Sequence, residues 1–155
     1  MEPSVLKFWR DYVNSLAPGL YQQKMPADVF AFGDSRELVD RLAMLVREGV
    51  KTATCSALWT YEEEQKPLPR RGDLSVVLDG NCVPVAIIET VDVFVSPFNE
   101  VPESFAYDEG EGDRSLGYWR EAHRRYFSRC LKNRAFDERM PLVCERFRVV
   151  HLAAF

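Results

Sequence analysis

The sequence lacks any long apolar run. No hydrophobic stretch approaches the roughly 20 residues that a membrane-spanning helix needs, and the N-terminus has no signal-peptide core. We therefore expect a cytoplasmic protein without a membrane partner. Internal repeats, low-complexity tracts and linkers are absent as well. A chain of 155 residues with these properties is expected to form one domain, spanning residues 1–155, with a sizeable core.

Cysteine and histidine are scarce, and their spacing does not suit a structural metal site. The residues concerned are Cys55, Cys82, Cys130, Cys144, His123 and His151. They include no Cys-x-x-Cys pair, whereas a structural zinc site draws on cysteines or histidines that are close in sequence. We assign no metal ligand among them. The cysteines are expected to be reduced and mostly buried, and His123 is expected to be a packed histidine.

Charge is distributed unevenly. The composition, 46% hydrophobic and 28% charged, excludes wholesale disorder, and the net charge is −4. Yet Arg114–Arg148 contains ten basic and four acidic residues, while Asn99–Asp113 contains six acidic residues and no basic one. A protein that turns one surface toward phosphates would show this split. A solvated helix offset by a neighbouring acidic loop would show it too.

Apolar residues recur at helical spacing in several segments. The helices predicted are Pro3–Leu16, Ser35–Glu48, Ala53–Glu64 and Arg114–Leu131. Pro18-Gly19 ends the first of them, and the second begins with Asp34 and Glu37 as a capping pair. The segment Tyr21–Phe32 has no clear period and is expected to be an ordered loop.

Other segments have the character of strands. The strands predicted are Leu74–Leu78, Val85–Val95 and Leu142–Leu152, with a turn at Asp79-Gly80-Asn81 between the first two. Strands mixed with unevenly placed helices favour the α+β class, with a small sheet or barrel decorated by helices.

Lys51 and Thr54 are the first candidates for chemistry, since they lie three residues apart where a predicted helix ends. A lysine that is partly desolvated can lose its proton near neutral pH and act as a base. A threonine hydroxyl becomes a nucleophile when such a base takes its proton. The alternative is a helix-capping Thr54 beside a solvated lysine.

An acidic loop is the second candidate. Glu109, Glu111 and Asp113 alternate with Gly110 and Gly112, which permit unusual backbone shapes. These carboxylates are suited to bind Mg²⁺ or Mn²⁺, to protonate a leaving group, or to accept a hydrogen bond from a nucleobase amine. The spacing excludes an EF-hand. For Asp113 we favour a simpler role, capping the long helix.

Further side chains are candidates for contacting a substrate: Glu111, Trp59, Tyr61, Arg120, Arg124 and Arg125. The aromatic rings can stack on a base and the arginines can bind phosphates. Core packing for Trp59 and simple solvation for the arginines are the alternatives. Glu89, within an apolar strand, is a weaker candidate.

Together these segments resemble the ASCH domain family, whose members have a β-barrel like that of PUA RNA-binding domains. The matching segments are Gly49–Thr54, Arg71–Asp73, Ile87–Thr90, Glu109–Asp113, Trp119-Arg120 with His123, and Val143–Phe147. The resemblance runs from about Phe32 to the C-terminus, with the helix of residues 3–16 packed on that domain. The Glu-Gly-Glu-Gly-Asp loop is typical of one longer bacterial branch.

The resemblance implies a PUA-like small β-barrel and a site. One small member is an amidohydrolase that removes acyl groups from N4-acylated cytidine. Its catalytic residues would fall on Lys51 as base, Thr54 as nucleophile and Glu109 as proton donor. We predict that these three residues converge on one cleft, with Glu111 and Arg120 at its rim. Longer bacterial members are linked to ribonuclease activity, in which a divalent cation, Mg²⁺ or Mn²⁺, can take part.

Three functions are therefore expected as alternatives. The first is an RNA-associated hydrolase, either ribonuclease-like or acting on a modified nucleoside. The second is an N4-acylcytidine amidohydrolase. The third is a non-catalytic module that binds RNA or a nucleotide.

Overall fold

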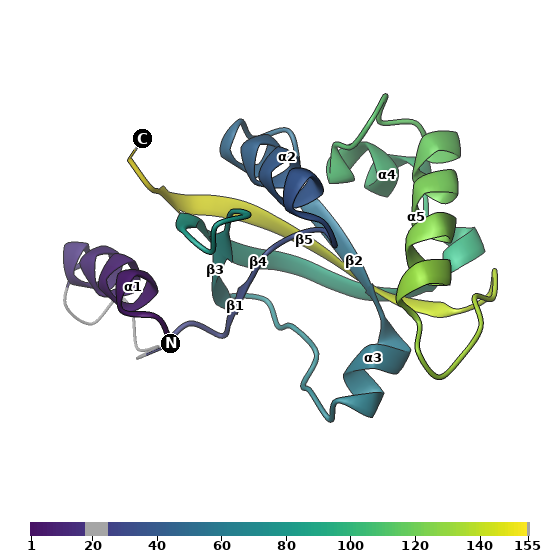
Figure 1. Ribbon diagram of the computed structural model, residues 1–155, viewed down its shortest axis with the longest axis horizontal. Coiled ribbons are helices and arrows are strands. Elements are labelled where there is room, and N and C mark those ends of the chain that lie inside the picture. Colours follow the sequence, from purple (N-terminus) through teal and green to yellow (C-terminus); the bar gives the residue numbers. More distant parts are fainter. Residues whose placement is uncertain (18–24, 155) are drawn as a thin grey trace.

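The protein is built around one mixed β-sheet in a computed structural model that describes residues 1–17 and 25–154. Its strands are β1 (Asp28–Phe30), β2 (Ala53–Ala57), β3 (Leu74–Leu78), β4 (Pro84–Pro97) and β5 (Pro141–Leu152). The strand order is β1-β3-β4-β5-β2, with β1 parallel to β3 and every other pair antiparallel. The sheet curls into a half-barrel (Figure 1), which confirms the predicted α+β class.

Helices are placed around this sheet. They are α1 (Pro3–Ser15), α2 (Arg36–Arg47), α3 (Leu58–Glu63), α4 (Glu103–Glu109) and α5 (Leu116–Cys130). In Figure 1, α1 lies at one end of the long strands, and α4 and α5 lie at the other. Over the described residues, no helix combines the length and the apolar character that crossing a membrane requires.

The middle of the sheet is covered on both faces. Val76 and Ile87 pack with Trp9 of α1, whereas Val77 and Ile88 pack with Val46 of α2. Successive residues of a strand point to opposite faces, so a helix on each side of the sheet helps to bury residues 74–77 of β3. The exposed fractions of Val76 and Val77 are both 0%, and burying each such side chain stabilises the fold by about 1.5–3 kcal/mol.

A third core joins α4 and α5 to the far end of the sheet. Phe105 of α4 and Trp119 of α5 pack with Phe98 and Leu142. Gly110 ends α4 with φ +76°, and a Cβ there would lie 2.6 Å from the carbonyl oxygen of Val50. Only glycine permits this approach. The loop after α4 is therefore held against the segment that leads to Lys51.

Most predicted helices and strands are confirmed to within two or three residues. The exception is the predicted helix Ala53–Glu64, which is wrong in its first half: residues 53–57 form β2, paired with β5, and only 58–63 are helical. Pairing with a distant strand overrides the local pattern here.

Two details of the turns also differ. The N-cap of α2 is Ser35, whose hydroxyl accepts a hydrogen bond from the Leu38 amide at 3.3 Å, in place of Asp34. The expected loop 21–32 contains the short strand β1. The stop at Pro18-Gly19 and positions 21–24 of that loop lie outside the described residues.

Candidate functional site

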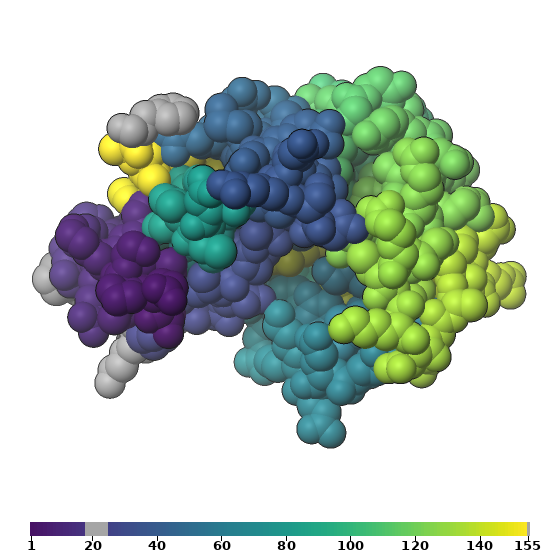
Figure 2. All heavy atoms as spheres, viewed as in Figure 1, coloured from purple at the N-terminus to yellow at the C-terminus, as the bar shows by residue number. Residues whose placement is uncertain are grey.

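A cavity of about 730 Å³ lies inside the half-barrel. Residues of the strands β1 to β5 contribute to its walls, together with α2, α3 and the segment that follows it, the end of α4, and α5. Figure 2 shows it as a hollow between α2, α3 and α5, with atoms of the C-terminal strand at its bottom. This volume is typical of pockets that hold a small organic ligand.

Lys51 lies in the wall of this cavity and is almost fully buried, with 2% of its surface exposed. Its ammonium group donates a hydrogen bond to the Ala53 carbonyl at 2.9 Å and lies 3.3 Å from a carboxylate oxygen of Glu111. A carboxylate oxygen of Glu109 lies 3.7 Å away. The lysine is therefore an element of a buried ionic site and not a solvated side chain.

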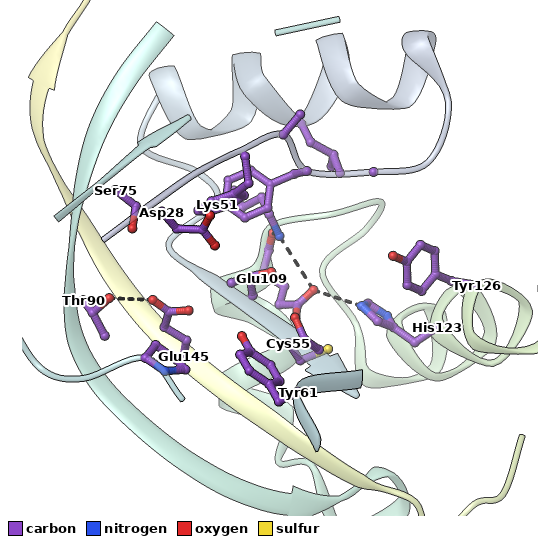
Figure 3. A pocket seen from close by; sticks show the side chains of 18 of the residues that line it. Asp28, Lys51, Cys55, Tyr61, Ser75, Thr90, Glu109, His123, Tyr126 and Glu145 are labelled. Carbon is purple, nitrogen blue, oxygen red and sulfur yellow. Dashed lines mark hydrogen bonds and ion pairs between the residues drawn. The ribbon is translucent and has the colours of Figure 1, made fainter. Parts of the chain in front are cut away.

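Glu109 is the last residue of α4 and is 1% exposed. Its Oε2 lies between Lys51 and His123, at 3.1 Å from His123 Nε2, as the dashed lines in Figure 3 show. Its second oxygen, Oε1, is buried and accepts no hydrogen bond from the described residues. A buried carboxylate oxygen without a partner is rare in folded proteins.

His123 joins the site from α5. Its Nδ1 lies 2.8 Å from the Trp119 carbonyl, and its ring stacks on Trp119 with 4.3 Å between centroids. The sequence predicted a packed histidine, and the ring does pack. The contact with Glu109 was not predicted, because it joins residues of two different helices. The available signal was the position of His123, one turn after Trp119 on the helix that follows the acidic loop.

The charges of these groups reinforce one another. Burial opposes ionisation of Glu109, but Lys51 and His123 outweigh it and lower the pKa of this carboxyl to about 2. Burial likewise disfavours the two cations, yet Glu109 raises the pKa of both Lys51 and His123. At neutral pH the carboxylate is ionised and the lysine is protonated.

Glu111 and Cys55 border this cluster, and the pKa values of both groups are raised. Burial, together with the neighbouring Glu109, raises the pKa of Glu111, although Lys51 opposes the shift. Burial and Glu109 also raise the pKa of the Cys55 thiol well above its usual value. Both groups therefore favour their neutral forms more than they would in water.

The other side of the cavity has its own polar groups, shown at the left of Figure 3. Thr90 donates a hydrogen bond to Glu145 at 2.5 Å, and burial raises the pKa of Glu145. Ser75, a residue only 7% exposed, also lines this side. Thr54 lies opposite Glu145 in the ladder between β2 and β5, so their side chains share one face.

Most of the sequence-based candidates lie in this cavity. Lys51 contacts both Glu109 and Glu111, and the cavity is lined further by Thr54, Tyr61 and Arg125. No interaction links the Thr54 hydroxyl to Lys51 or Glu109 over the described parts of the chain. Sequence reasoning did not single out three further lining residues: Cys55, Tyr126 and Glu145.

Three candidates are not among the lining residues. Trp59 packs against the core around Trp119, with the Arg134 guanidinium 4.5 Å from its ring. Arg120 is exposed and donates a hydrogen bond to the Asn99 carbonyl at 3.5 Å. Arg124 pairs with Glu138 at 2.9 Å.

The acidic loop does not gather oxygen ligands for Mg²⁺ or Mn²⁺. Glu109 and Glu111 face Lys51, and Asp113 accepts a hydrogen bond from the Ser115 amide. The N-cap of α5 is Ser115, whose hydroxyl accepts a hydrogen bond from the Tyr118 amide at 3.1 Å, in place of Asp113. Across residues 1–17 and 25–154, the one group of three potential metal ligands is Cys55, Glu109 and His123. Sulfur and nitrogen donors do not suit Mg²⁺.

Comparison with known proteins identifies the family. The model of the ASCH domain family matches residues 28–151. A crystal structure of a protein from Enterococcus faecalis V583 is 42% identical, with a TM-score of 0.89 over 98% of this chain and 91% of that one. An ASCH domain from Lactobacillus crispatus JV V101 is 35% identical, with a TM-score of 0.91 over 97% and 96%. Among curated proteins no relative matches. The half-barrel is thus PUA-like, of the RNA-binding type, and the chain belongs to the ASCH domain family.

Proposed function

We propose that this protein is a hydrolase that removes an acyl group from a modified nucleoside of RNA. One observation carries the proposal: Lys51, Glu109 and His123 form a buried charged cluster in the wall of a cavity of about 730 Å³ that Thr54 also lines. A protonated lysine and a protonated histidine that both pair with one carboxylate, together with a hydroxyl group, are the components of an acyl-transfer site. We also propose, from the Glu109–Asp113 loop, that the chain belongs to the longer bacterial branch of the family.

In the proposed reaction, the Thr54 hydroxyl attacks the acyl carbon and Glu145 takes its proton. Glu145 suits this role because it is the cross-strand neighbour of Thr54 and burial raises its pKa toward neutrality. The charged Lys51 stabilises the negative oxygen that forms on the acyl group. The pKa of Lys51 is raised, which supports its action as a cation and not as the base.

The second half of the reaction releases the two products. The bond between the acyl carbon and the amine breaks, and His123 donates a proton to the leaving amine. Glu145 and His123 first return to their starting protonation states by exchange of one proton through solvent. Water then attacks the acyl ester of Thr54 while Glu145 takes a proton from it. The ester C–O bond breaks and Glu145 returns that proton to the Thr54 oxygen, which yields a carboxylic acid and restores the threonine. Glu109 keeps Lys51 and His123 charged and oriented throughout.

The burial of the site favours a group on a base over the RNA backbone. Lys51 and Glu109 are only 2% and 1% exposed, so a phosphodiester within a strand cannot reach them without a large rearrangement. A substituent on a single base can enter the cavity alone. Ribonuclease activity is therefore the second candidate, and it is favoured by the exposed Arg125, which lines the cavity.

The direct test uses the full chain with N4-acetylcytidine and, separately, with single-stranded RNA, each with and without EDTA. Mass spectrometry of the released cytidine and acetate, or of RNA fragments, reports turnover. Lys51→Met and Thr54→Ala are expected to lower kcat/KM by at least about 100-fold, since each removes a group that acts on the transition state.

Thr60→Ala is the matched control, because Thr60 is exposed on α3 and outside the cavity. This variant should change kcat/KM by less than about twofold. Full turnover in Lys51→Met would contradict the proposal. Tight RNA binding by the wild type with no turnover of either substrate would instead identify a non-catalytic RNA-binding module.

A further inference from the structure

Three groups of different chemistry converge on one point of the cavity wall. The Sγ of Cys55, a carboxylate oxygen of Glu109 and a ring nitrogen of His123 all lie within 4.8 Å of one another. They come from β2, α4 and α5, so no sequence motif unites them. The proposed hydrolysis gives no role to Cys55.

Two details of these groups are typical of a metal site. The Trp119 carbonyl can only accept a hydrogen bond, so Nδ1 of His123 carries a proton and Nε2 faces Glu109. Histidines that bind metals usually donate their second ring N–H in this way, which fixes the ring with its other nitrogen toward the ion. In addition, Glu109 Oε1 is buried without a partner among the described residues.

Carboxylates also lie next to the three groups. Glu109 Oε2 lies 3.1 Å from His123 Nε2, and a carboxylate oxygen of Glu111 lies 3.3 Å from the Lys51 ammonium. A divalent cation bound here would take the place of the protons carried by the Cys55 thiol and by His123 Nε2.

We propose that Cys55, Glu109 and His123 bind Zn²⁺ or a similar thiophilic divalent ion, with the fourth position open to the cavity. One thiolate, one imidazole and one carboxylate form a ligand set that suits zinc, and three protein ligands leave a position for water. In a tetrahedral site with ordinary zinc distances, ligand atoms lie about 3.3–3.6 Å apart. His123 Nε2 and Glu109 Oε2 are 3.1 Å apart, slightly closer than this range, and the three ligand atoms all lie within 4.8 Å of one another, so an ion can be bound after small shifts of these side chains.

The metal-bound state differs from the one proposed for hydrolysis, because His123 is neutral when it binds the ion and cannot then donate a proton. Metal binding is measured without substrate, so it does not rest on the proposed hydrolysis. The full chain is freed of metal with a chelator and titrated with Co²⁺, which reports thiolate ligation by a charge-transfer band in the near ultraviolet. One equivalent should produce that band, together with the visible bands of a four-coordinate ion. Zn²⁺ should then displace the Co²⁺ and abolish both.

Calorimetry of Zn²⁺ binding gives a readout that needs no variant. Titrations in buffers of different ionisation enthalpy should reveal at least about one proton released per ion near neutral pH, from the Cys55 thiol that becomes a thiolate ligand. Affinity should fall steeply as the pH is lowered. Binding that releases no proton would overturn the assignment.

Variants then locate the site. Cys55→Ser should abolish the charge-transfer band, and His123→Gln should weaken binding at least about tenfold. Cys82→Ser is the matched control, since this exposed cysteine should leave the titration unchanged. A band that survives in Cys55→Ser, a band that disappears with Cys82→Ser, or no binding by the wild type would each exclude the proposed site.

Discussion

The buried charged residues of the site depend on one another for charge compensation. Glu109 is the only carboxylate that contacts both Lys51 and His123 in the described structure, and all three are at least largely buried. Removing a buried charge from such a pair leaves its partner unpaired in a medium of low dielectric constant. That cost greatly exceeds the contribution of an exposed ion pair.

We therefore predict that Glu109→Gln lowers the free energy of unfolding by about 3–5 kcal/mol, measured by urea denaturation at neutral pH. The control is Asp11→Asn, which makes the same acid-to-amide change in the exposed pair with Lys7, in which the side chains of Lys7 and Asp11 are 77% and 59% exposed. This control should change the free energy of unfolding by less than about 1 kcal/mol. Equal effects of the two substitutions would show that the buried ion pairs of Glu109 contribute no more to the free energy of unfolding than an exposed ion pair does.

The same cluster predicts a dependence of stability on pH. The pKa of Glu109 is about 2 in the folded protein, below the reference value of 4.5. Its contribution is therefore complete above about pH 4.5 and is lost as the pH falls toward 2. His123 has the opposite sign: its raised pKa gives stability that is complete below its reference value of 6.5 and lost as the pH rises through the folded value.

Urea denaturation across this pH range checks both windows. In the wild type, the free energy of unfolding should decline on the acid side and also on the alkaline side. Glu109→Gln should flatten both slopes, because it removes the carboxylate that titrates on the acid side and raises the pKa of His123 on the alkaline side. An alkaline slope that stays unchanged in Glu109→Gln would mean that His123 is charged for another reason.

At the level of helices and strands, the loop after α4 decides whether the site forms. Gly110 has φ +76°, and a Cβ at this position would lie 2.6 Å from the Val50 carbonyl oxygen. Gly110→Ala must therefore strain the backbone and push α4 away from the segment that holds Lys51. Both effects would weaken the contact between Lys51 and Glu109.

We predict that Gly110→Ala lowers the free energy of unfolding by about 1–3 kcal/mol and, by displacing Glu109, reduces activity along with it. Gly117→Ala is the matched control, because a Cβ there meets nothing within 4 Å and Gly117 lies within α5. In a helix this second change should be neutral or stabilising by about 0.5–1 kcal/mol. Thermal melting of both variants measures the contrast, and a stable, active Gly110→Ala would show that the loop tolerates displacement.

The sequence predicted the elements whose own residues carry the signal. The apolar period of α1, α2 and α5, and the β-branched runs of β3, β4 and β5, are local patterns that tertiary structure then confirms. The two edge strands were missed for a physical reason. Ala53–Ala57 and Asp28–Phe30 are short, and their strand conformation comes from pairing with β5 and β3, which lie far away in sequence.

The residues of the site were likewise predicted only where the sequence itself carries a motif. Lys51, Thr54 and Glu109 were found through motifs, and the contact between Lys51 and Glu109 is present. The places of His123, Cys55 and Glu145 were not predicted, because each is defined by a neighbour from another element. A histidine on an apolar helix face and a glutamate in a strand carry no local sign of the cavity that they line.

At the scale of the whole molecule, the proposed function requires a protein of net charge −4 to bind RNA. General attraction to phosphates is weak for such a chain, so binding depends on a local basic surface. The side of α5 that borders the cavity offers one, because the exposed Arg125 and Arg129 are among the lining residues. Arg129 is paired with Asp34 at 2.8 Å, whereas Arg125 makes no ion pair with any described residue. Arg125 is thus the arginine best placed to meet a phosphate.

We predict that Arg125→Ala weakens binding of single-stranded RNA to a similar extent for different sequences, because an arginine that binds a phosphate reads no base. The slope of log K against log salt should become shallower by about 0.7–0.9, the change expected when one phosphate is no longer neutralised. Arg10→Ala is the control: Arg10 is exposed on α1, at the opposite end of the sheet from α5, and its replacement removes the same charge from the molecule. Fluorescence anisotropy at several salt concentrations measures both slopes. If the two variants change the slope equally, RNA responds only to the net charge of the protein, and the basic side of α5 serves to solvate the helix.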